Sequence, residues 1–207
     1  ERKKGIKRTI QYRPDGNDFV CVNGKNRYTR ALYGGITDFR IETSDRPVFA
    51  TYKPKDSKHI CFRLQCGNQS IALDSLKFCE ARYRAGRRTY RLTDPLLGKG
   101  ELNISVLAFP DAEGGIWRFT MKDMPEGALL HCYISEIRAK NLSRNGDMGA
   151  DRADSFDAPQ LPKEQKHYKL SLDGTTAYIV VEDQELRLPA LVEGTSLYDK
   201  SEKWRSE

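Results

Sequence analysis

The sequence predicts an all-β fold: one antiparallel β-sandwich with little or no helix. Segments in which apolar and polar residues alternate with a period of two recur about every ten residues, which is typical of sandwiches and barrels. Turn residues such as Gly, Asn and Asp separate these segments. The 207 residues are 38% hydrophobic and 10% aromatic, enough to bury one core. We therefore expect a single domain over residues 1–207.

The expected strands follow one another along the chain. The first is predicted to pass through a hairpin turn at Asn23-Gly24 into the second. The only helical candidate is the tail from Leu197 to Trp204. In order, the strands are Asp18–Val22, Arg27–Tyr33, Asp38–Glu42, Val48–Tyr52, His59–Leu64, Ser70–Leu73, Asn103–Phe109, Trp117–Met121 and Leu129–Ile137.

Two further hairpins can be registered residue by residue. A turn at Asp173-Gly174 places Leu172 opposite Thr175, which predicts a ribbon with one apolar and one polar face. A turn at Ala85-Gly86 pairs Arg84 with Arg87. The apolar face of this second hairpin holds Cys79, Ala81, Tyr83, Tyr90 and Leu92, and the opposite face holds Glu80, Arg82, Arg84, Arg87, Thr89 and Arg91.

The arginines of this second hairpin are candidate binding residues. Like charges directly opposite one another in a ladder repel, so Arg82, Arg84, Arg87 and Arg91 need water, counterions or an acidic partner. One interpretation is a solvated surface. The other is contact with an anionic partner, such as an acidic polysaccharide, a neighbouring domain or nucleic acid.

Charge and hydropathy narrow the possible partners. The net charge of +6 permits nucleic-acid binding, yet 29 acidic residues are interleaved with 35 basic ones. No zinc-finger, RNP or helix-turn-helix pattern occurs, so we do not expect nucleic acid as a partner. No run of eighteen apolar residues is present, which predicts no membrane span.

The cysteines do not suggest disulfides or a metal site. All five lie within apolar strand patterns, which predicts buried free thiols. Neither C-x-x-C nor H-x-x-x-H spacing occurs, so we expect no metal and no cofactor. The cysteines are Cys21, Cys61, Cys66, Cys79 and Cys132.

Catalytic motifs are also missing from the sequence. No G-x-S-x-G elbow or phosphate-binding Gly-rich loop occurs, and no pair of carboxylates is singled out for glycoside hydrolysis. His59, His131 and His167 all lie in strand patterns, which favours structural or surface roles. We expect no catalytic residue in this chain alone. The polar segment from Lys140 to Lys166 is either an ordinary loop or, through its Asp and Asn side chains, a cation site.

Three segments of the chain resemble a bacterial family, the domain of unknown function 4450, which is abundant in Bacteroidetes. They are YRPDGNDFVCVNGKNRYTRALYGG (Tyr12 to Gly35), ETSDRPVFATYKP (Glu42 to Pro54) and SRNGDMGADRADSFD (Ser143 to Asp157). The resemblance implies a supersandwich-like domain at the N-terminus of an exported protein, periplasmic or at the cell surface. A region similar to six-hairpin (α/α) barrel glycosidases follows it in such proteins.

The resemblance also implies a role and a site. The chain would be a non-catalytic accessory domain of a glycoside hydrolase acting on polysaccharide, with a downstream catalytic barrel as its partner. Residues from about 196 to 207 would then begin the linker to the barrel. Arg144, Asp147 and Asp151 belong to the family's R-x-G-D-x-G-x-D stretch, and by analogy their loop is the candidate for shaping the barrel mouth.

Trp117 and Arg118 are the candidates for direct contact with sugar. They follow the Gly114-Gly115 turn, where an exposed indole ring beside a guanidinium would form a platform for a sugar ring. The alternative is a core Trp between the sheets, because Trp117 shares one face with Phe119 and Met121. The rival functions are a stand-alone carbohydrate-binding module for acidic glycans, a complete hydrolase and a protein-docking module.

Overall fold

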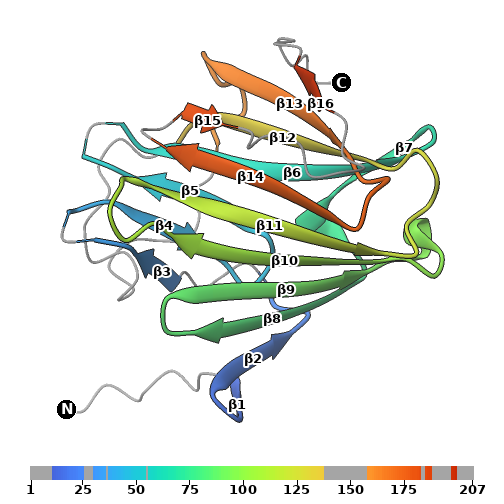
Figure 1. The fold of residues 1–207 in the computed structure, drawn as a ribbon, viewed down its shortest axis with the longest axis horizontal. Helices are drawn as coiled ribbons and strands as arrows, with labels where there is room; N and C mark the ends of the chain where they lie inside the picture. The colour runs from blue at the N-terminus through green and yellow to red at the C-terminus, as the bar shows by residue number, and fades with distance from the viewer. Residues whose placement is uncertain are drawn as a thin grey trace, which may run out of the picture.

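The chain folds into two antiparallel sheets that pack face to face (Figure 1). The computed structural model describes residues 11–25, 30–35, 37–54, 56–137 and 158–182, together with the backbone of 185–187 and 197–199. Each sheet has eight strands. Helix in the described part is confined to two single-turn 3₁₀ segments, η1 (Leu73–Ser75) and η2 (Pro95–Leu97), so no described helix is long and apolar enough to cross a bilayer.

Sheet A has the strand order β1-β2-β8-β9-β10-β11-β14-β15. Its strands are β1 (Arg13–Asp15), β2 (Asp18–Val22), β8 (Phe78–Arg84), β9 (Arg87–Thr93), β10 (Glu101–Ala108), β11 (Gly114–Lys122), β14 (Thr176–Glu182) and β15 (Glu185–Arg187). Sheet B has the order β16-β13-β12-β6-β5-β4-β3, with β7 also paired to β6. Its strands are β3 (Arg30–Tyr33), β4 (Arg40–Thr43), β5 (Val48–Tyr52), β6 (Lys58–Cys66), β7 (Gln69–Ala72), β12 (Leu129–Glu136), β13 (Gln165–Ser171) and β16 (Leu197–Asp199).

A single apolar core lies between the two sheets. Alternate residues of β6, β9, β10, β11 and β12 point inward and are almost completely buried. Phe49 lies at the centre of an aromatic cluster and meets Phe62, Tyr90 and Trp117 edge to face, with ring centroids 5.9, 5.7 and 5.6 Å away. Such geometry suits the positive edge and negative face of aromatic rings.

The structure confirms the all-β sandwich, and it confirms the Ala85-Gly86 hairpin in register. Arg84 pairs with Arg87 and Tyr83 with Arg88. Gly86 adopts a φ of 78°, which a residue with a side chain rarely adopts, so the two-residue turn needs this glycine.

Two other predicted hairpins are wrong, because their turns carry the chain from one sheet to the other. After Asn23-Gly24 the chain leaves β2 in sheet A for β3 in sheet B. Gly24 lies so close to Asp45 that a Cβ atom would stand 2.3 Å from the Asp45 Cβ. Likewise β13 pairs with β12 and β14 with β11, so Leu172 and Thr175 are not cross-strand partners.

The ends of the chain also differ from expectation. β1 was not predicted; it pairs with β2 at the edge of sheet A. The helical candidate in the tail is wrong over Leu197–Asp199, because these residues form β16 and pair with β13.

Candidate functional site

The outer face of sheet B carries polar side chains in regular rows. Along β6, Phe62 and Leu64 belong to the core, so Cys61 and Arg63 point outward. The strand registers then align the outward residues across neighbouring strands. The central row consists of Val48, Cys61, Tyr133 and His167. The row on one side of it consists of Arg63, His131 and Lys169, and the row on the other side of Ala50, His59, Ser135 and Gln165.

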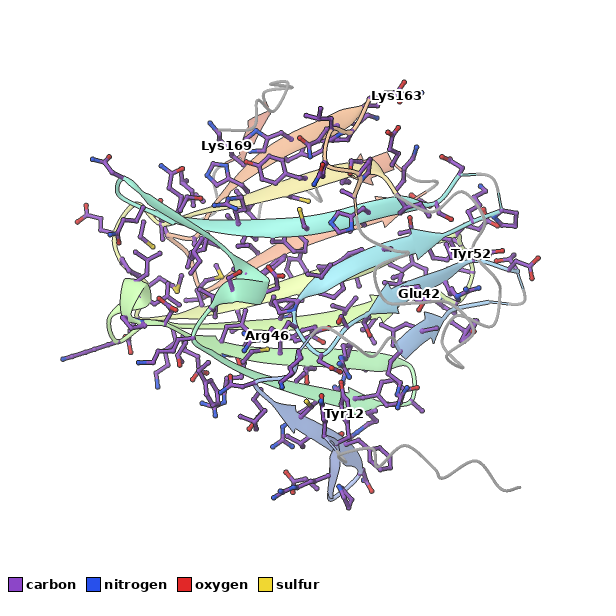
Figure 2. The ribbon with its side chains drawn as sticks, turned by 180° about the vertical axis from the view of Figure 1, so that it is seen from behind. Tyr12, Glu42, Arg46, Tyr52, Lys163 and Lys169 are labelled. Carbon is purple, nitrogen blue, oxygen red and sulfur yellow. The ribbon has the colours of Figure 1, made fainter. Side chains whose placement is uncertain are left out.

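A groove of about 710 Å³ lies over these rows. Its floor is the outer face of β5, β6 and β12, and one wall is the segment from Ala158 to Pro162. This wall is anchored at its base, because the backbone N–H of Lys163 donates to Glu136 Oε1 at 3.1 Å. Figure 2 views the molecule from the side of sheet B, with Lys163 and Lys169 marking the edge formed by β13 and the segment before it.

The Tyr133 side chain lines the groove. Its ring stacks on the His167 imidazole, with centroids 4.4 Å apart and planes within 5° of parallel. On the opposite side the same row continues to Cys61 and Val48, whose small side chains leave space above the sheet. Tyr133, Cys61 and Val48 line the groove, and His167 does not. The stack on His167 therefore supports the Tyr133 ring from outside the groove.

His131 is a neutral imidazole whose hydrogen bonds place its proton on Nε2. Gln65 Nε2 donates to the Gly67 carbonyl at 3.1 Å, so Gln65 Oε1 is the atom that accepts from His131 Nε2 at 2.7 Å. His131 Nδ1 therefore accepts from His167 Nε2 at 2.9 Å. Burial, followed by the nearby His167, Lys169 and Arg63, lowers the pKa of His131 to about 4.

The groove floor combines an inert thiol with two charged groups. Burial, reinforced by the Asp74 carboxylate, raises the pKa of Cys61 to about 12, although Arg63 acts in the opposite direction. Cys61 is therefore not a thiolate nucleophile at neutral pH. Arg63 donates through Nε and Nη2 to the side chain and carbonyl of Ser70, at 3.2 and 3.3 Å. Among the described residues, the groove lining thus includes one cation, Arg63, one anion, Asp74, and the Tyr133 ring.

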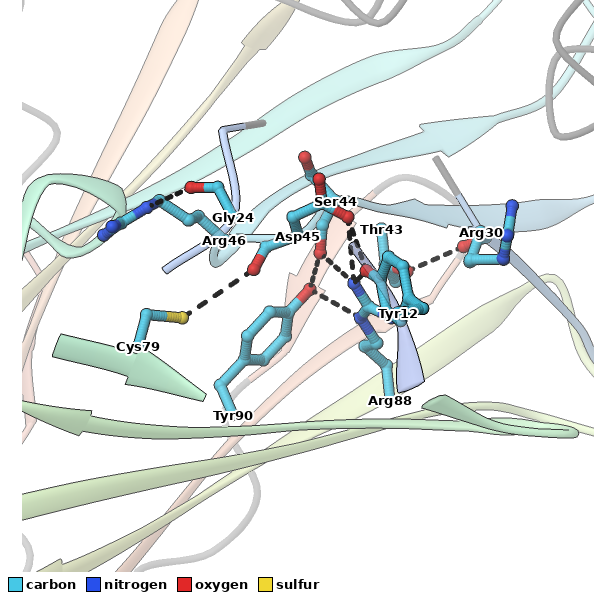
Figure 3. A network of polar contacts seen from close by, with 10 residues as sticks. All are labelled: Tyr12, Gly24, Arg30, Thr43, Ser44, Asp45, Arg46, Cys79, Arg88 and Tyr90. Atoms are coloured by element: carbon cyan, nitrogen blue, oxygen red, sulfur yellow. Dashed lines mark hydrogen bonds and ion pairs between the residues drawn. The ribbon is translucent and has the colours of Figure 1, made fainter. Parts of the chain in front are cut away.

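A second polar cluster lies between the sheets at one edge of the core (Figure 3). Arg88 points inward from β9 and has no exposed surface. Its Nη2 donates to the Tyr12 hydroxyl and the Ser44 carbonyl, and its Nε donates to the Tyr90 hydroxyl at 3.3 Å. The Tyr12 hydroxyl in turn donates to Asp45 Oδ1, which lies 3.9 Å from Arg88 Nη2.

This inter-sheet cluster joins three separate parts of the chain. Tyr90 also donates to the Ser44 carbonyl at 2.7 Å, and burial raises its pKa to about 12. Arg46 clasps the neighbouring turns by donating to the carbonyls of Gly24, Asp74 and Leu76 at 2.7 to 3.1 Å. Because these groups are buried, bond to one another and lie away from the groove, their geometry supports a structural role.

The predicted arginines of the β8–β9 hairpin lie on the outer face of sheet A, and acidic residues of the same chain neutralise most of them. Arg82 lies 2.9 Å from Asp15 and 3.0 Å from Glu80, and Arg84 lies 2.6 Å from Asp18. Arg91 approaches Glu80 and Glu101 at 3.8 and 3.5 Å, whereas Arg87 is exposed at the turn. The required acidic partner is thus partly supplied by β1, β2, β8 and β10.

Trp117 and Arg118 point in opposite directions. Trp117 is completely buried in the core, so its ring cannot form the exposed platform, and it takes the alternative core position. Arg118 is exposed on the outer face of sheet A, in the same lateral row as Ser105 and Tyr178. The structure therefore brings Arg118 to the same face as the hairpin arginines, and it separates both from the groove.

Three predicted residues, Arg144, Asp147 and Asp151, lie outside the described residues. All five cysteines carry free thiols; Cys21, Cys79 and Cys132 are buried as predicted, but Cys61 and Cys66 are partly exposed. Among the described residues, no three His, Cys, Asp or Glu side chains are grouped as a metal site would require.

Sequence reasoning missed the residues of the groove and of the inter-sheet cluster. Tyr133, Arg63 and His131 come from strands far apart in the chain, and only the register places them together. The sequence did contain one indication for Arg88. The hairpin register pairs it with Tyr83 on the apolar face, where a buried cation needs polar partners.

Comparison with known proteins identifies the family of the chain. No curated protein matches it. The model of one protein family, described as Domain of unknown function (DUF4450), matches residues 54–182, which is more than half of the chain. This range contains every groove residue named above except Val48. The chain belongs to the DUF4450 family.

Proposed function

We propose that this chain is a non-catalytic accessory domain of an exported polysaccharide-degrading protein, and that the groove over sheet B contacts the polysaccharide. The observation that carries this proposal is the Tyr133 ring, held by its stack on His167, beside planar polar side chains that line the same groove. The volume of the groove, about 710 Å³, falls within the range of about 300–1,000 Å³ that is usual for small-ligand sites.

The chemistry of the groove suits a sugar ring. The C–H face of a pyranose packs on an aromatic ring, and its hydroxyls exchange hydrogen bonds with planar groups. Tyr133 supplies the ring face, while Arg63, Asp74 and Gln165 supply donors and acceptors around it. The apolar wall residue Leu161 is 76% exposed and lies where it would cover a bound sugar.

Binding fits the groove better than cleavage. Glycoside hydrolysis uses two carboxylates about 5 to 10 Å apart. Asp74 is the only carboxylate among the described residues that line the groove. We therefore propose that catalysis belongs to another part of the same polypeptide, an (α/α) barrel according to the family resemblance, against which the sandwich packs.

Binding of the purified chain to a panel of neutral and acidic polysaccharides, measured by calorimetry, tests the proposal. Tyr133→Ala is expected to weaken binding about tenfold, which corresponds to about 1.4 kcal/mol for the loss of one stacking ring. Tyr178→Ala, on the outer face of sheet A, is the matched control and should leave the affinity unchanged. Equal effects of the two substitutions would contradict the proposed site.

The accessory role has its own test. The natural reading frame should continue into a barrel, and the longer protein should degrade a polysaccharide that the chain of residues 1–207 binds but does not cleave. Hydrolysis by residues 1–207 alone would overturn this role and favour a complete hydrolase. A frame that ends at this domain, together with glycan binding, would favour a stand-alone carbohydrate-binding module.

A further inference from the structure

A cationic row borders the groove. Arg63, His131 and Lys169 occupy one lateral row across β6, β12 and β13. Since neighbouring strands are about 4.8 Å apart, the backbones that carry Arg63 and Lys169 are about 10 Å apart. Arg63 also lines the groove, so this row leads directly from the floor beside Tyr133 towards the edge of the sheet.

The two cations of this row are not neutralised as those of sheet A are. Arg82, Arg84 and Arg91 each form a salt bridge with a described carboxylate. Among the described residues, neither Arg63 nor Lys169 forms one, and Arg63 Nη1 donates to no described group. Asp74, which lines the groove, follows β7 by two residues, and β7 pairs with β6 on the side opposite β12 and β13, the strand of Lys169.

His131 provides a fixed neutral spacer between the two cations. Its Nε2–H is committed to Gln65 and its Nδ1 to His167. The side chains that face it are Arg63 and Gln65 from β6, His167 and Lys169 from β13 and Tyr133 from its own strand, none of which is acidic. Positive charge therefore prevails along this row.

We propose that the row of Arg63, His131 and Lys169 binds the anionic groups of an acidic polysaccharide, one ring of which lies in the groove against Tyr133. This inference rests on the proposed function and adds the class of ligand to it. Arg63 Nη1 and the Lys169 ammonium form charge-assisted hydrogen bonds with carboxylate or sulfate oxygens. Asp74 accepts hydrogen bonds from hydroxyls at the other end of the groove, which gives the bound chain a direction.

Two matched pairs of polymers test this inference. Polygalacturonate is compared with its fully methyl-esterified form, and dextran sulfate with dextran, so that the two members of each pair share a sugar backbone and one of them lacks the anionic groups. The wild-type chain should bind at least one acidic polymer more tightly than its neutral counterpart, and the difference should shrink as the salt concentration rises. Preference for one acid over the other identifies carboxylate or sulfate as the group that is bound.

Substitutions locate the effect. Arg63→Gln and Lys169→Gln should each weaken binding of the preferred acidic polymer about two- to fivefold, the range for partly exposed ion pairs, and leave the neutral form unaffected. Arg118→Gln, on the opposite sheet, is the control and should change nothing. By NMR, the acidic polymer should also raise the pKa of His131, which a purely structural row would not show.

The outcomes separate this inference from the proposed function. If the neutral polymers bind as tightly as the acidic ones and Tyr133→Ala weakens the binding of both, the inference fails and the proposed function stands. If acidic polymers bind, but Arg118→Gln weakens their binding and Arg63→Gln and Lys169→Gln do not, the anion site is on sheet A and the inference again fails. If no polysaccharide of the panel binds, both fail.

Discussion

Replacing Arg88 with Met removes the guanidinium from the centre of the inter-sheet cluster while keeping most of the side-chain volume. The Arg88 side chain has no exposed surface, and it donates to Tyr12, Ser44 and Tyr90. Its loss leaves the fully buried Asp45 carboxylate without the guanidinium 3.9 Å away. Removing one partner of a buried charge pair costs about 3–5 kcal/mol.

For a domain of this size, that loss corresponds to a decrease in Tm on the order of 10 °C. Urea unfolding followed by circular dichroism measures the free energy directly. Arg87→Met is the matched control, because Arg87 is the neighbouring residue and is exposed; it should change the free energy of unfolding by less than about 0.5 kcal/mol.

A double variant separates the lost charge from the lost packing. If Arg88→Met is destabilising because it removes the guanidinium beside a buried carboxylate, adding Asp45→Asn should cost less than the sum of the two single substitutions. An additive double variant, or equal losses for Arg88→Met and Arg87→Met, would refute the argument that this cluster holds the edge of the sandwich together.

Three further predictions concern the protonation state of His131, the acids of sheet A and the core. The folded-state pKa of His131, about 4, lies below the ordinary 6.5, so between these pH values the unfolded chain binds a proton that the folded chain does not. The free energy of unfolding should therefore fall by about 3 kcal/mol as the pH drops from 6.5 to 4. Urea titrations should show this pH dependence in the wild type and its loss in His131→Gln. Hydrogen bonding to Arg84, and then to Arg82, lowers the pKa of Asp18. Asp18→Asn should release Arg84, whereas Arg82 keeps Asp15 and Glu80, and should increase binding of dextran sulfate in a variant that already lacks the Arg63 and Lys169 charges; no increase would show that the Arg84–Asp18 pair does not mask this face. Trp117→Phe should lower the free energy of unfolding by roughly 1–3 kcal/mol and leave glycan affinity unchanged in calorimetry, because the ring lies in the core; a loss of affinity at full folding would contradict its placement.

Strands and local turns could be predicted from the sequence because both depend on neighbouring residues. Alternation defines β2 and β5 to the residue, and the two-residue turn at Ala85-Gly86 fixes the register of β8 and β9. The turns at Asn23-Gly24 and Asp173-Gly174 also place a glycine second but join strands of different sheets. Alternation is the same whether two consecutive strands pair or face one another across the core, so it cannot distinguish these cases.

The groove could not be predicted for a related reason. Tyr133 and Cys61 are cross-strand neighbours, and their strands are separated along the chain by much of sheet A. A Tyr or an Arg in an alternating segment has the same appearance at a solvated surface and in a groove. The position of Trp117 was only partly predictable, since its alternation with Phe119 and Met121 allowed the core but could not exclude exposure at the strand end.

Mapping amide chemical shifts by NMR while a short acidic oligogalacturonide is added tests the central claim most directly. The proposal that the outer face of sheet B is the glycan site predicts that the largest changes occur at Cys61, Arg63 and Tyr133 and along the neighbouring wall segment. Changes concentrated around Arg91 and Arg118 on the outer face of sheet A would contradict it.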